Sequence, residues 1–394
     1  MTDTDPRRWH TLALVALAEL LGMSLWFTAS AVAPQLAALW DLDSGQTAAL
    51  TTMVQIGFVA GTAVATLLNL ADLVPARWLF AGSALAGAVA NGLLVVAPGY
   101  GTALALRFFT GFFLAGVYPP AMKMIATWFR AARGLAIGIV VGSLTVGKAT
   151  PYLIRAVQGA EYRWVVMAAS AAAAVAALLV VAGYREGPFP FPRRPFSWGL
   201  AGTVLRHRPT RLAIAGYLGH MWELYAMWTW VPAFLAASLA ARGGMRAGWA
   251  DLAAFGAIAA GGLGCLWGGW AADRIGRERL VNQAMAASGA CSLVIGFVFG
   301  GPFWLVALIT WVWGFFVVAD SAQFSALVTE VAPSHAVGTA LTLQTSLGFL
   351  LTGATIHLVP VLVTATGWPW AFPVLALGPG AGIVAISRLA RGRR

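Results

Sequence analysis

The sequence is poor in charged residues, in cysteine and in histidine. Only 10% of its 394 residues are charged, and Asp and Glu together number 14. Soluble domains carry about 25% charged residues because a surface that faces water needs them, so an ordinary soluble protein is excluded. Apolar residues make up 60% of the chain and form blocks near the roughly 20 residues that cross a bilayer as a helix. The composition predicts an all-α integral membrane protein.

Residue patterns of common enzyme classes are also missing. The sequence has no HExxH, no GxSxG and no cluster of cysteines and histidines, which argues against an enzyme. Its two cysteines, Cys265 and Cys291, fall in apolar segments and are expected to pack there. The net charge of +11 comes from arginines spread over the loops rather than from one patch. We expect no cofactor, no metal and no nucleic-acid partner.

Twelve apolar segments are visible, starting near residues 10, 47, 78, 102, 134, 163, 210, 249, 280, 303, 338 and 369. With a cytoplasmic N-terminus, the inner loops and tails hold 18 of the 25 basic residues and the outer loops hold four. The positive-inside rule then predicts a multi-pass protein of the cytoplasmic (inner) membrane with both termini in the cytoplasm. A cleaved signal peptide ending at Ala29-Ser30-Ala31 is the alternative for the N-terminus, but Glu19 interrupts its apolar run.

The longest polar interruption, residues 185–209, contains five prolines and separates six segments from six. We therefore expect an N-terminal bundle over 1–184, a cytoplasmic linker over 185–209 and a C-terminal bundle over 210–394.

The two halves repeat each other. The pattern E-L-x-small-M-x-x-W begins at Glu19 in segment 1 and at Glu223 in segment 7, and Gly-Phe-Phe begins at Gly111 and at Gly314, with offsets of 204 and 203. The repeat predicts twelve transmembrane helices in two pseudo-symmetric six-helix bundles, with a ligand site between them near mid-membrane.

The loop after segment 8 carries the most specific motif. Gly269, Asp273, Arg274, Gly276 and Arg277 follow the pattern GxxxDRxGRxx, and the whole chain resembles the major facilitator superfamily, in which this pattern marks a cytoplasmic gate. The resemblance implies a secondary transporter with the twelve-helix fold.

Other family signatures are incomplete. The loop after segment 2, residues 71–77, is a degraded copy of the gate motif, which leaves open whether the first half has the usual latch. Arg107 with Gly111 resembles the RxxxG motif, which the family associates with proton coupling. Segment 5 lacks the adjoining Gly-Pro of drug-exporting antiporters, and segments 2 and 8 lack the arginines of nitrate-type carriers.

The stretch GSLTVGKAT at residues 142–150 comes within one residue of a phosphate-binding loop. Ala149 stands where that loop needs a hydroxyl for Mg²⁺, and the stretch lies inside a membrane segment, so we expect no nucleotide partner. Gly134, Gly138 and Gly142, spaced by four, are expected to let two helices approach closely. Lys148 is then an intramembrane cation.

Six ionisable residues fall within the segments. Each costs about 2.5 to 3.5 kcal/mol at a helix centre facing lipid, so they must face a cavity or one another. Three acids and three bases could also pair completely, and Lys123 could extend to the headgroups. The six residues are Glu19, Arg107, Lys123, Lys148, Glu223 and Asp320.

Glu, Met and Trp recur at i, i+4 and i+7 on segments 1 and 7, which places Glu19 with Trp26 and Glu223 with Trp230 on one stripe each. His220 extends the second stripe by a turn. A buried carboxylate can exchange protons near neutrality, and a tryptophan face can hold an apolar or cationic ligand. The plainer interpretation is that Met and Trp only pack.

Three further faces carry polar residues. Asp320 shares a face with Trp313, and Arg107 nearly aligns with Tyr118. Lys148, Tyr152 and Arg155 form a basic track on segment 5, unless Arg155 belongs to the headgroup region. His357 is taken as a packing residue.

We expect a proton-coupled transporter that works by alternating access as a monomer, with a small-molecule substrate, protons and membrane lipids as its partners. A small anion moved by symport is favoured, because the segments supply cations. The alternatives are a proton antiporter that exports an amphipathic or cationic compound, and a non-transporting receptor or scaffold. The expected proton-coupling residues are Glu19, Glu223, Asp320 and Arg107, and the expected substrate contacts are Trp26, Tyr118, Lys148, His220 and Trp230.

Overall fold

The computed structural model describes residues 5–68, 70–130, 132–158, 161–189, 197–244 and 248–393, and nearly all of them are helical. Eleven helical stretches in this part of the chain are long and apolar enough to cross a membrane. They begin within a few residues of the predicted starts of segments 2 to 12, and segment 1 is present as three shorter helices. The prediction of an all-α, twelve-segment membrane protein is confirmed.

The chain forms two compact units, Met1–Arg193 and Arg194–Arg394. Their boundary falls within the predicted linker, of which residues 190–196 lie outside the described residues. The described remainder of the linker is not all extended, since it includes a nine-residue helix, α11 (Trp198–Arg206).

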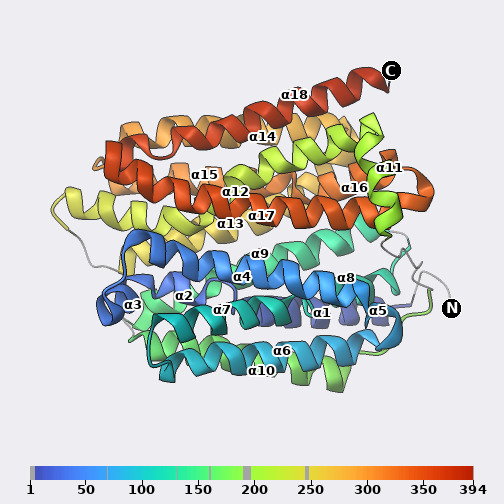
Figure 1. Cartoon of the computed structure of the whole chain (residues 1–394), viewed down its shortest axis with the longest axis horizontal. Helices are drawn as coiled ribbons and strands as arrows, with labels where there is room; N and C mark the ends of the chain where they lie inside the picture. Colours follow the sequence, from blue (N-terminus) through green and yellow to red (C-terminus); the bar gives the residue numbers. More distant parts are fainter. Residues whose placement is uncertain are drawn as a thin grey trace. The chain divides into compact units, whose positions relative to one another are not determined.

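The first unit, coloured blue to green in Figure 1, packs its long helices in neighbouring pairs. The most extensive contacts join α4 to α7, α6 to α10, and α1 to both α9 and α10. Its helices are α1 (Arg7–Met23), α2 (Thr28–Ala31), α3 (Ala33–Trp40), α4 (Ser44–Leu67), α5 (Leu70–Leu73), α6 (Ala76–Gly92), α7 (Tyr100–Leu114), α8 (Tyr118–Ala126), α9 (Arg133–Gln158) and α10 (Tyr162–Gly183).

The second unit, coloured yellow-green to red in Figure 1, repeats this scheme. The most extensive contacts join α13 to α15, α12 to both α17 and α18, and α14 to α18. Besides α11, its helices are α12 (Arg208–Ala241), α13 (Gly248–Ile275), α14 (Arg277–Val294), α15 (Phe303–Ala319), α16 (Ser321–Val331), α17 (Val337–Thr366) and α18 (Leu377–Gly392).

Glycines bring equivalent helices together in both units. A Cβ at Gly61 on α4 would overlap the carbonyl oxygen of Phe112 on α7, and a Cβ at Gly264 on α13 would overlap that of Phe315 on α15. Both residues of this contact are related by the offset of 203 found in the sequence. Only glycine permits such an approach, so the duplication predicted from the motifs extends to the packing.

The close helix contact predicted at Gly134 on segment 5 is absent, and another glycine makes one. A Cβ at Gly134 would meet nothing within 4 Å, whereas one at Gly147 would overlap the carbonyl oxygen of Leu20 on α1. The close approach therefore takes place one residue before Lys148, within the stretch that resembles a phosphate-binding loop.

Two segments are interrupted where polar residues lie. Segment 4 divides into α7 and α8, because Pro119 and Pro120 occupy the first turn of α8, where proline is tolerated. Segment 10 divides into α15 and α16 at Asp320.

Candidate functional site

Segment 1 stops being helical at Met23 and resumes at Thr28, which leaves backbone carbonyls without their usual partners. The Arg107 guanidinium donates to the Leu25 oxygen at 3.2 Å and to the Trp26 oxygen at 2.5 Å. The Thr28 hydroxyl donates to the Ser24 oxygen at 2.9 Å. Side chains thus replace the missing helical hydrogen bonds.

Arg107 is fully buried and is held by a second element. Its Nη1 donates to the Asn91 side-chain oxygen at 2.9 Å, and the Asn91 amide donates to the Ser170 hydroxyl at 3.0 Å and to the Val166 carbonyl at 3.2 Å. Arg155 on α9 makes a similar contact, because it donates to the carbonyl of Ala31 at the end of α2. Both arginines therefore contact the interrupted segment. Among the described residues, the hydrogen bonds of Arg107 go to carbonyl and amide oxygens.

Glu19, Trp26 and Lys148 form what we call the N-terminal cluster. Glu19 is fully buried and neither carboxylate oxygen has a hydrogen-bond partner among the described residues. The Lys148 ammonium lies 4.0 Å from the centroid of the Trp26 ring, a cation–π contact. Glu19 and Lys148 are close enough to interact electrostatically. The structure thus brings together three of the residues that the sequence singled out.

The predicted alignment of Tyr118 with Arg107 depends on a helix that the structure interrupts. That alignment assumed a continuous helix, but α7 ends at Leu114 and α8 begins at Tyr118. Tyr118 is half-buried at the start of α8.

The second unit holds its acids differently. Glu223 is buried on α12, and its two oxygens accept hydrogen bonds from the Ser288 hydroxyl at 2.7 Å and from the Trp313 indole N–H at 2.8 Å. Ser288 lies on α14 and Trp313 on α15. Neutral donors from two helices therefore fix this carboxylate.

Asp320 and His220 lie next to this carboxylate and, with Glu223, Ser288 and Trp313, make up the C-terminal cluster. His220 Nδ1 is 2.9 Å from an Asp320 oxygen, although the contact is not aligned as a hydrogen bond, and His220 Nε2 is 3.0 Å from the Ser321 hydroxyl. Both Asp320 and His220 are buried, and the charge of Asp320 acts on Glu223. The cluster thus brings two carboxylates and one imidazole together in a buried part of the second unit.

The Trp230 side chain contacts residues outside the C-terminal cluster. Its indole N–H donates to the Ile356 carbonyl at 2.8 Å, and its ring lies 6.5 Å from that of Trp368. Trp313, which the sequence placed on the face of Asp320, donates a hydrogen bond to Glu223. His357 Nδ1 lies 2.9 Å from the Gly353 carbonyl in its own helix, in line with a packing role.

The gate motif covers the end of α13, the turn at Gly276 and the start of α14. Gly276 has φ +86°, which favours glycine at this turn, while Gly269 has nothing within 4 Å of its Cβ position. Neighbouring Gly268 instead approaches the Ala319 carbonyl. Arg274 stacks on Trp270 with 3.8 Å to the ring centroid, and Asp273 is exposed.

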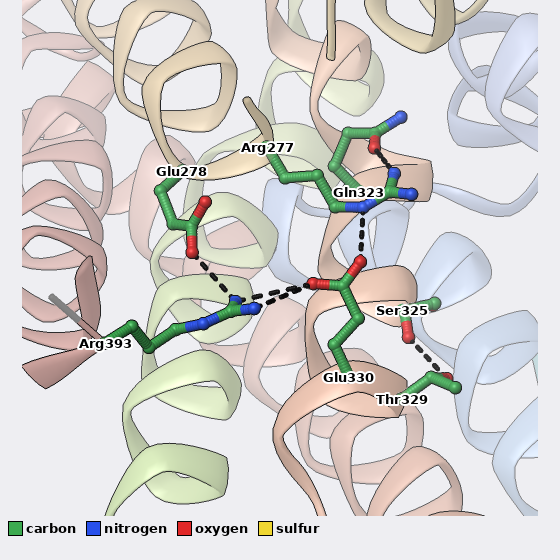
Figure 2. Close-up of polar contacts among 7 residues, drawn as sticks. All are labelled: Arg277, Glu278, Gln323, Ser325, Thr329, Glu330 and Arg393. Atoms are coloured by element: carbon green, nitrogen blue, oxygen red, sulfur yellow. Dashed lines mark hydrogen bonds and ion pairs between the residues drawn. The ribbon is translucent and has the colours of Figure 1, made fainter. Parts of the chain in front are cut away.

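Arg277 anchors an ion-pair network that Figure 2 shows. Its Nε donates to Glu330 at 2.7 Å and its Nη1 to Gln323 at 2.5 Å, both on α16. Arg393, next to the C-terminus, donates to Glu278 at 2.8 Å and to the second oxygen of Glu330 at 3.3 Å. Glu330 therefore links the motif to the end of α18.

Sequence reasoning missed Ser288, Asn91, Glu330 and Arg393. A single serine or asparagine in an apolar segment carries no pattern that marks it as a partner of a distant charge. Glu330 could have been found, since it is an acid that follows segment 10 on the side where the basic gate motif is predicted.

Comparison with known proteins agrees with this architecture. The sequence matches the model of the Major Facilitator Superfamily over residues 14–356. The fold is similar to that of a mutant of the nucleoside transporter NupG, with a TM-score of 0.74 over 97% of this chain and 99% of that one, at 13% identity. A comparison with curated proteins found no match. The chain belongs to the Major Facilitator Superfamily of secondary transporters.

Proposed function

We propose that the chain couples solute movement to protons, and that Glu223 and Asp320 are its main proton carriers. The observation that supports this is the C-terminal cluster, in which two buried acids interact and one is paired with a histidine. Buried carboxylates with a neighbouring imidazole can exchange protons in the physiological range. The halves would alternate access to the site by rocking against each other.

For the substrate we propose a small anion that contacts Lys148 and Trp26 in the N-terminal cluster. Lys148 is the cation that supports this assignment, because the guanidinium of Arg107 is bonded to carbonyls and Asn91. Tyr118, His220 and Trp230 remain the other proposed contacts. We further propose that the protein acts as a monomer in the cytoplasmic membrane with both termini in the cytoplasm, as the basic residues favour.

Export of an amphipathic or cationic compound in exchange for protons is the second candidate. Its support is the excess of buried acid, since Glu19, Glu223 and Asp320 are all buried while Arg107 is bonded elsewhere. The nucleoside named for NupG is not carried over, because 13% identity relates the folds alone.

The test is proton-driven flux in proteoliposomes with an imposed pH gradient, against a panel of small anions and of amphipathic cations. We expect accumulation of an anion that stops in Glu223→Gln and continues in Glu278→Gln, whose acid lies in the ion-pair network instead. Movement of cations alone, in the direction opposite to that of the protons, would favour the second candidate. Absence of any proton-linked flux for folded protein would favour a receptor or scaffold.

A further inference from the structure

We propose that the lipid-facing side of the helix pair α14 and α18 binds an anionic phospholipid, whose phosphate lies among Arg279, Arg388 and Arg391. These three arginines, which we call the arginine group, take no part in either cluster or in the ion-pair network of Figure 2. The proposal does not depend on what the protein transports.

Two hydrogen bonds define how α14 and α18 lie against each other. The Asn282 amide donates to the Ser387 hydroxyl at 3.1 Å, and about one turn away Arg393 donates to Glu278 at 2.8 Å. Lower residue numbers on α14 therefore face higher residue numbers on α18, so the two helices run antiparallel. By the same register, the first arginine of the group, on α14, lies at the level of the last one, on α18.

Each helix carries an exposed, mostly apolar stripe that ends in arginine. The positions recur every three or four residues, as on one face of a helix. They are Leu377, Ala381, Val384, Arg388 and Arg391 on α18, and Phe297, Leu293, Ala290, Ala286, Gln283 and Arg279 along α14 and the turn that follows it.

The two stripes face the same side of the helix pair. Asn282 and Ser387 mark the sides of α14 and α18 that touch. On both helices the stripe lies about 70° further round from this residue, in the sense in which the chain winds. In two antiparallel helices, equal rotations of this kind lead to the same side. The arginine group therefore gathers at one end of a continuous apolar surface.

The length of this surface places the arginine group at the level of the phospholipid headgroups. Arg279 and Phe297 are 18 residues apart, which corresponds to about 27 Å of helix against a hydrocarbon core of about 30 Å. Arginine side chains at such a level lay their stems along the lipid tails and reach the headgroups with their charged ends. A lipid phosphate is then the anion within their reach.

The protein supplies no counterion to the arginine group. The helix α18 contains no acid, and the only acid on α14 is Glu278, which Arg393 binds. Glu330 is bound by Arg393 and by the gate motif. Asp273 is exposed at the end of α13 and, among the described residues, forms no ion pair with the group. Three unbalanced guanidinium groups favour an anionic ligand, and their planar donors match the oxygens of a phosphate.

The corresponding helices of the first unit, α6 and α10, lack such a group. At the equivalent end, Arg77 stacks on the neighbouring Trp78 with 4.9 Å to the ring centroid, and Arg185 is followed by the acid Glu186. Basic residues at the cytoplasmic side are expected in both units, but only the second unit gathers three of them on one helix pair. The site is therefore a local feature of α14 and α18.

The experiment is a lipid titration of the purified full-length protein in detergent, with phosphatidylglycerol, phosphatidylcholine and inorganic phosphate as separate probes. The melting temperature and native mass spectrometry, which counts bound lipids, are the readouts. We expect phosphatidylglycerol to bind and stabilise the wild type more than the other two probes. In the triple variant Arg279→Gln, Arg388→Gln and Arg391→Gln, its affinity should fall by roughly 100-fold, since each basic residue near an anionic surface contributes about fivefold.

The matched control removes three basic residues outside the site, Arg77→Gln, Arg185→Gln and Arg206→Gln, so both triple variants have the same net charge. Its affinity for phosphatidylglycerol should change by less than about twofold, because salt screens charges that are far from the site. Without lipid, the site variant should melt like the wild type, since its arginines are exposed and bind no acid among the described residues. If it does not fold, the single variants replace it, each with an expected loss of about fivefold.

Three results would overturn the inference. An equal loss of affinity in both triple variants would mean that the lipid is attracted by net charge alone. Equal binding of phosphatidylcholine would mean that the headgroup charge is not recognised. Stabilisation by inorganic phosphate that disappears in the site variant, without a response to phosphatidylglycerol, would make this a site for a soluble anion.

Discussion

Glu19 and Glu223 occupy equivalent positions on segments 1 and 7, yet their surroundings differ. Glu19 has no hydrogen-bond donor among the described residues and has a lysine nearby. Glu223 has two neutral donors, Ser288 and Trp313, and an acid nearby. A duplicated carboxylate has therefore been given a basic partner in one half and hydrogen bonds in the other.

In the sequence, neither half carries the residue that contacts the equivalent carboxylate in the other half. At the offset of 203 to 204, the counterparts of Lys148 are Leu351 and Thr352, and the counterpart of Trp313 is Thr110. The helices that carry the acids differ too, since segment 1 is interrupted after Met23 while α12 continues through Trp230. From this difference we expect the two acids to have separate roles, and the following experiments test the contacts that distinguish the two halves.

The largest loss of stability is expected for Arg107, whose hydrogen bonds across the interruption of segment 1 we call the clamp and which has no equivalent arginine in the second half. Arg107→Gln removes the donors to the carbonyls of Leu25 and Trp26 and should cost about 3 to 5 kcal/mol of unfolding free energy. The counterpart at the offset of 203 is Thr310, whose hydroxyl donates to the Ala307 carbonyl in its own helix. Thr310→Ala should cost less than about 1 kcal/mol. Denaturant titration of both variants in detergent measures the contrast, and equal losses would reject the clamp.

A smaller effect is expected at the helix contact beside Lys148. Gly147→Ala must push α9 from the Leu20 carbonyl and should cost about 1 to 3 kcal/mol. Gly134→Ala meets nothing within 4 Å and should be neutral or stabilise the helix by up to about 1 kcal/mol. The same titration measures both. If Gly134→Ala were the more harmful change, the pairing of α9 with α1 would be wrong.

Ser288 tests the hydrogen bonds of the second half. Ser288→Ala removes a donor from Glu223 and should cost about 1 kcal/mol. The cost should grow at alkaline pH, where the carboxylate is ionised and its hydrogen bonds are stronger. Ser292→Ala, which removes only a bond to the Gly289 carbonyl, serves as control and should show no such pH dependence. A pH-independent loss for Ser288→Ala would mean that the hydroxyl matters only for packing.

The smallest effect is expected in the ion-pair network of Figure 2. Arg393→Gln removes contacts with Glu278 and Glu330, but its side chain is 40% exposed, so we expect about 0.5 kcal/mol, falling further with added salt. Arg391→Gln in the same turn is the control. Melting temperatures at low and high salt measure the difference. A loss that salt leaves unchanged would point to packing of the Arg393 side chain instead.

The sequence predicted most of the fold and part of the site. Segment positions and the duplication could be predicted, because hydropathy reports burial in lipid directly and repeated motifs survive in both halves. The interruption of segment 1 could not, since no proline lies between Gly22 and Thr28 and the partners of its carbonyls come from distant segments. The break between α7 and α8 removes the basis for aligning Tyr118 with Arg107, because a periodic pattern assumes an unbroken helix. The stripe on segment 7 predicted Glu223 and His220 together, but only the structure shows that Trp230 bonds elsewhere.

The interruption in segment 1 also imposes an order on membrane insertion. The carbonyls of Leu25 and Ala31 accept hydrogen bonds from Arg107 and Arg155, which are synthesised 82 and 124 residues later. At about 5 to 20 residues per second, the ribosome needs roughly 4 to 16 s to reach Arg107. An unsatisfied carbonyl costs several kcal/mol in lipid, so segment 1 must be shielded by water or by the insertion machinery for those seconds. The first segment made can therefore reach its final conformation only after segments 4 and 5 have been made.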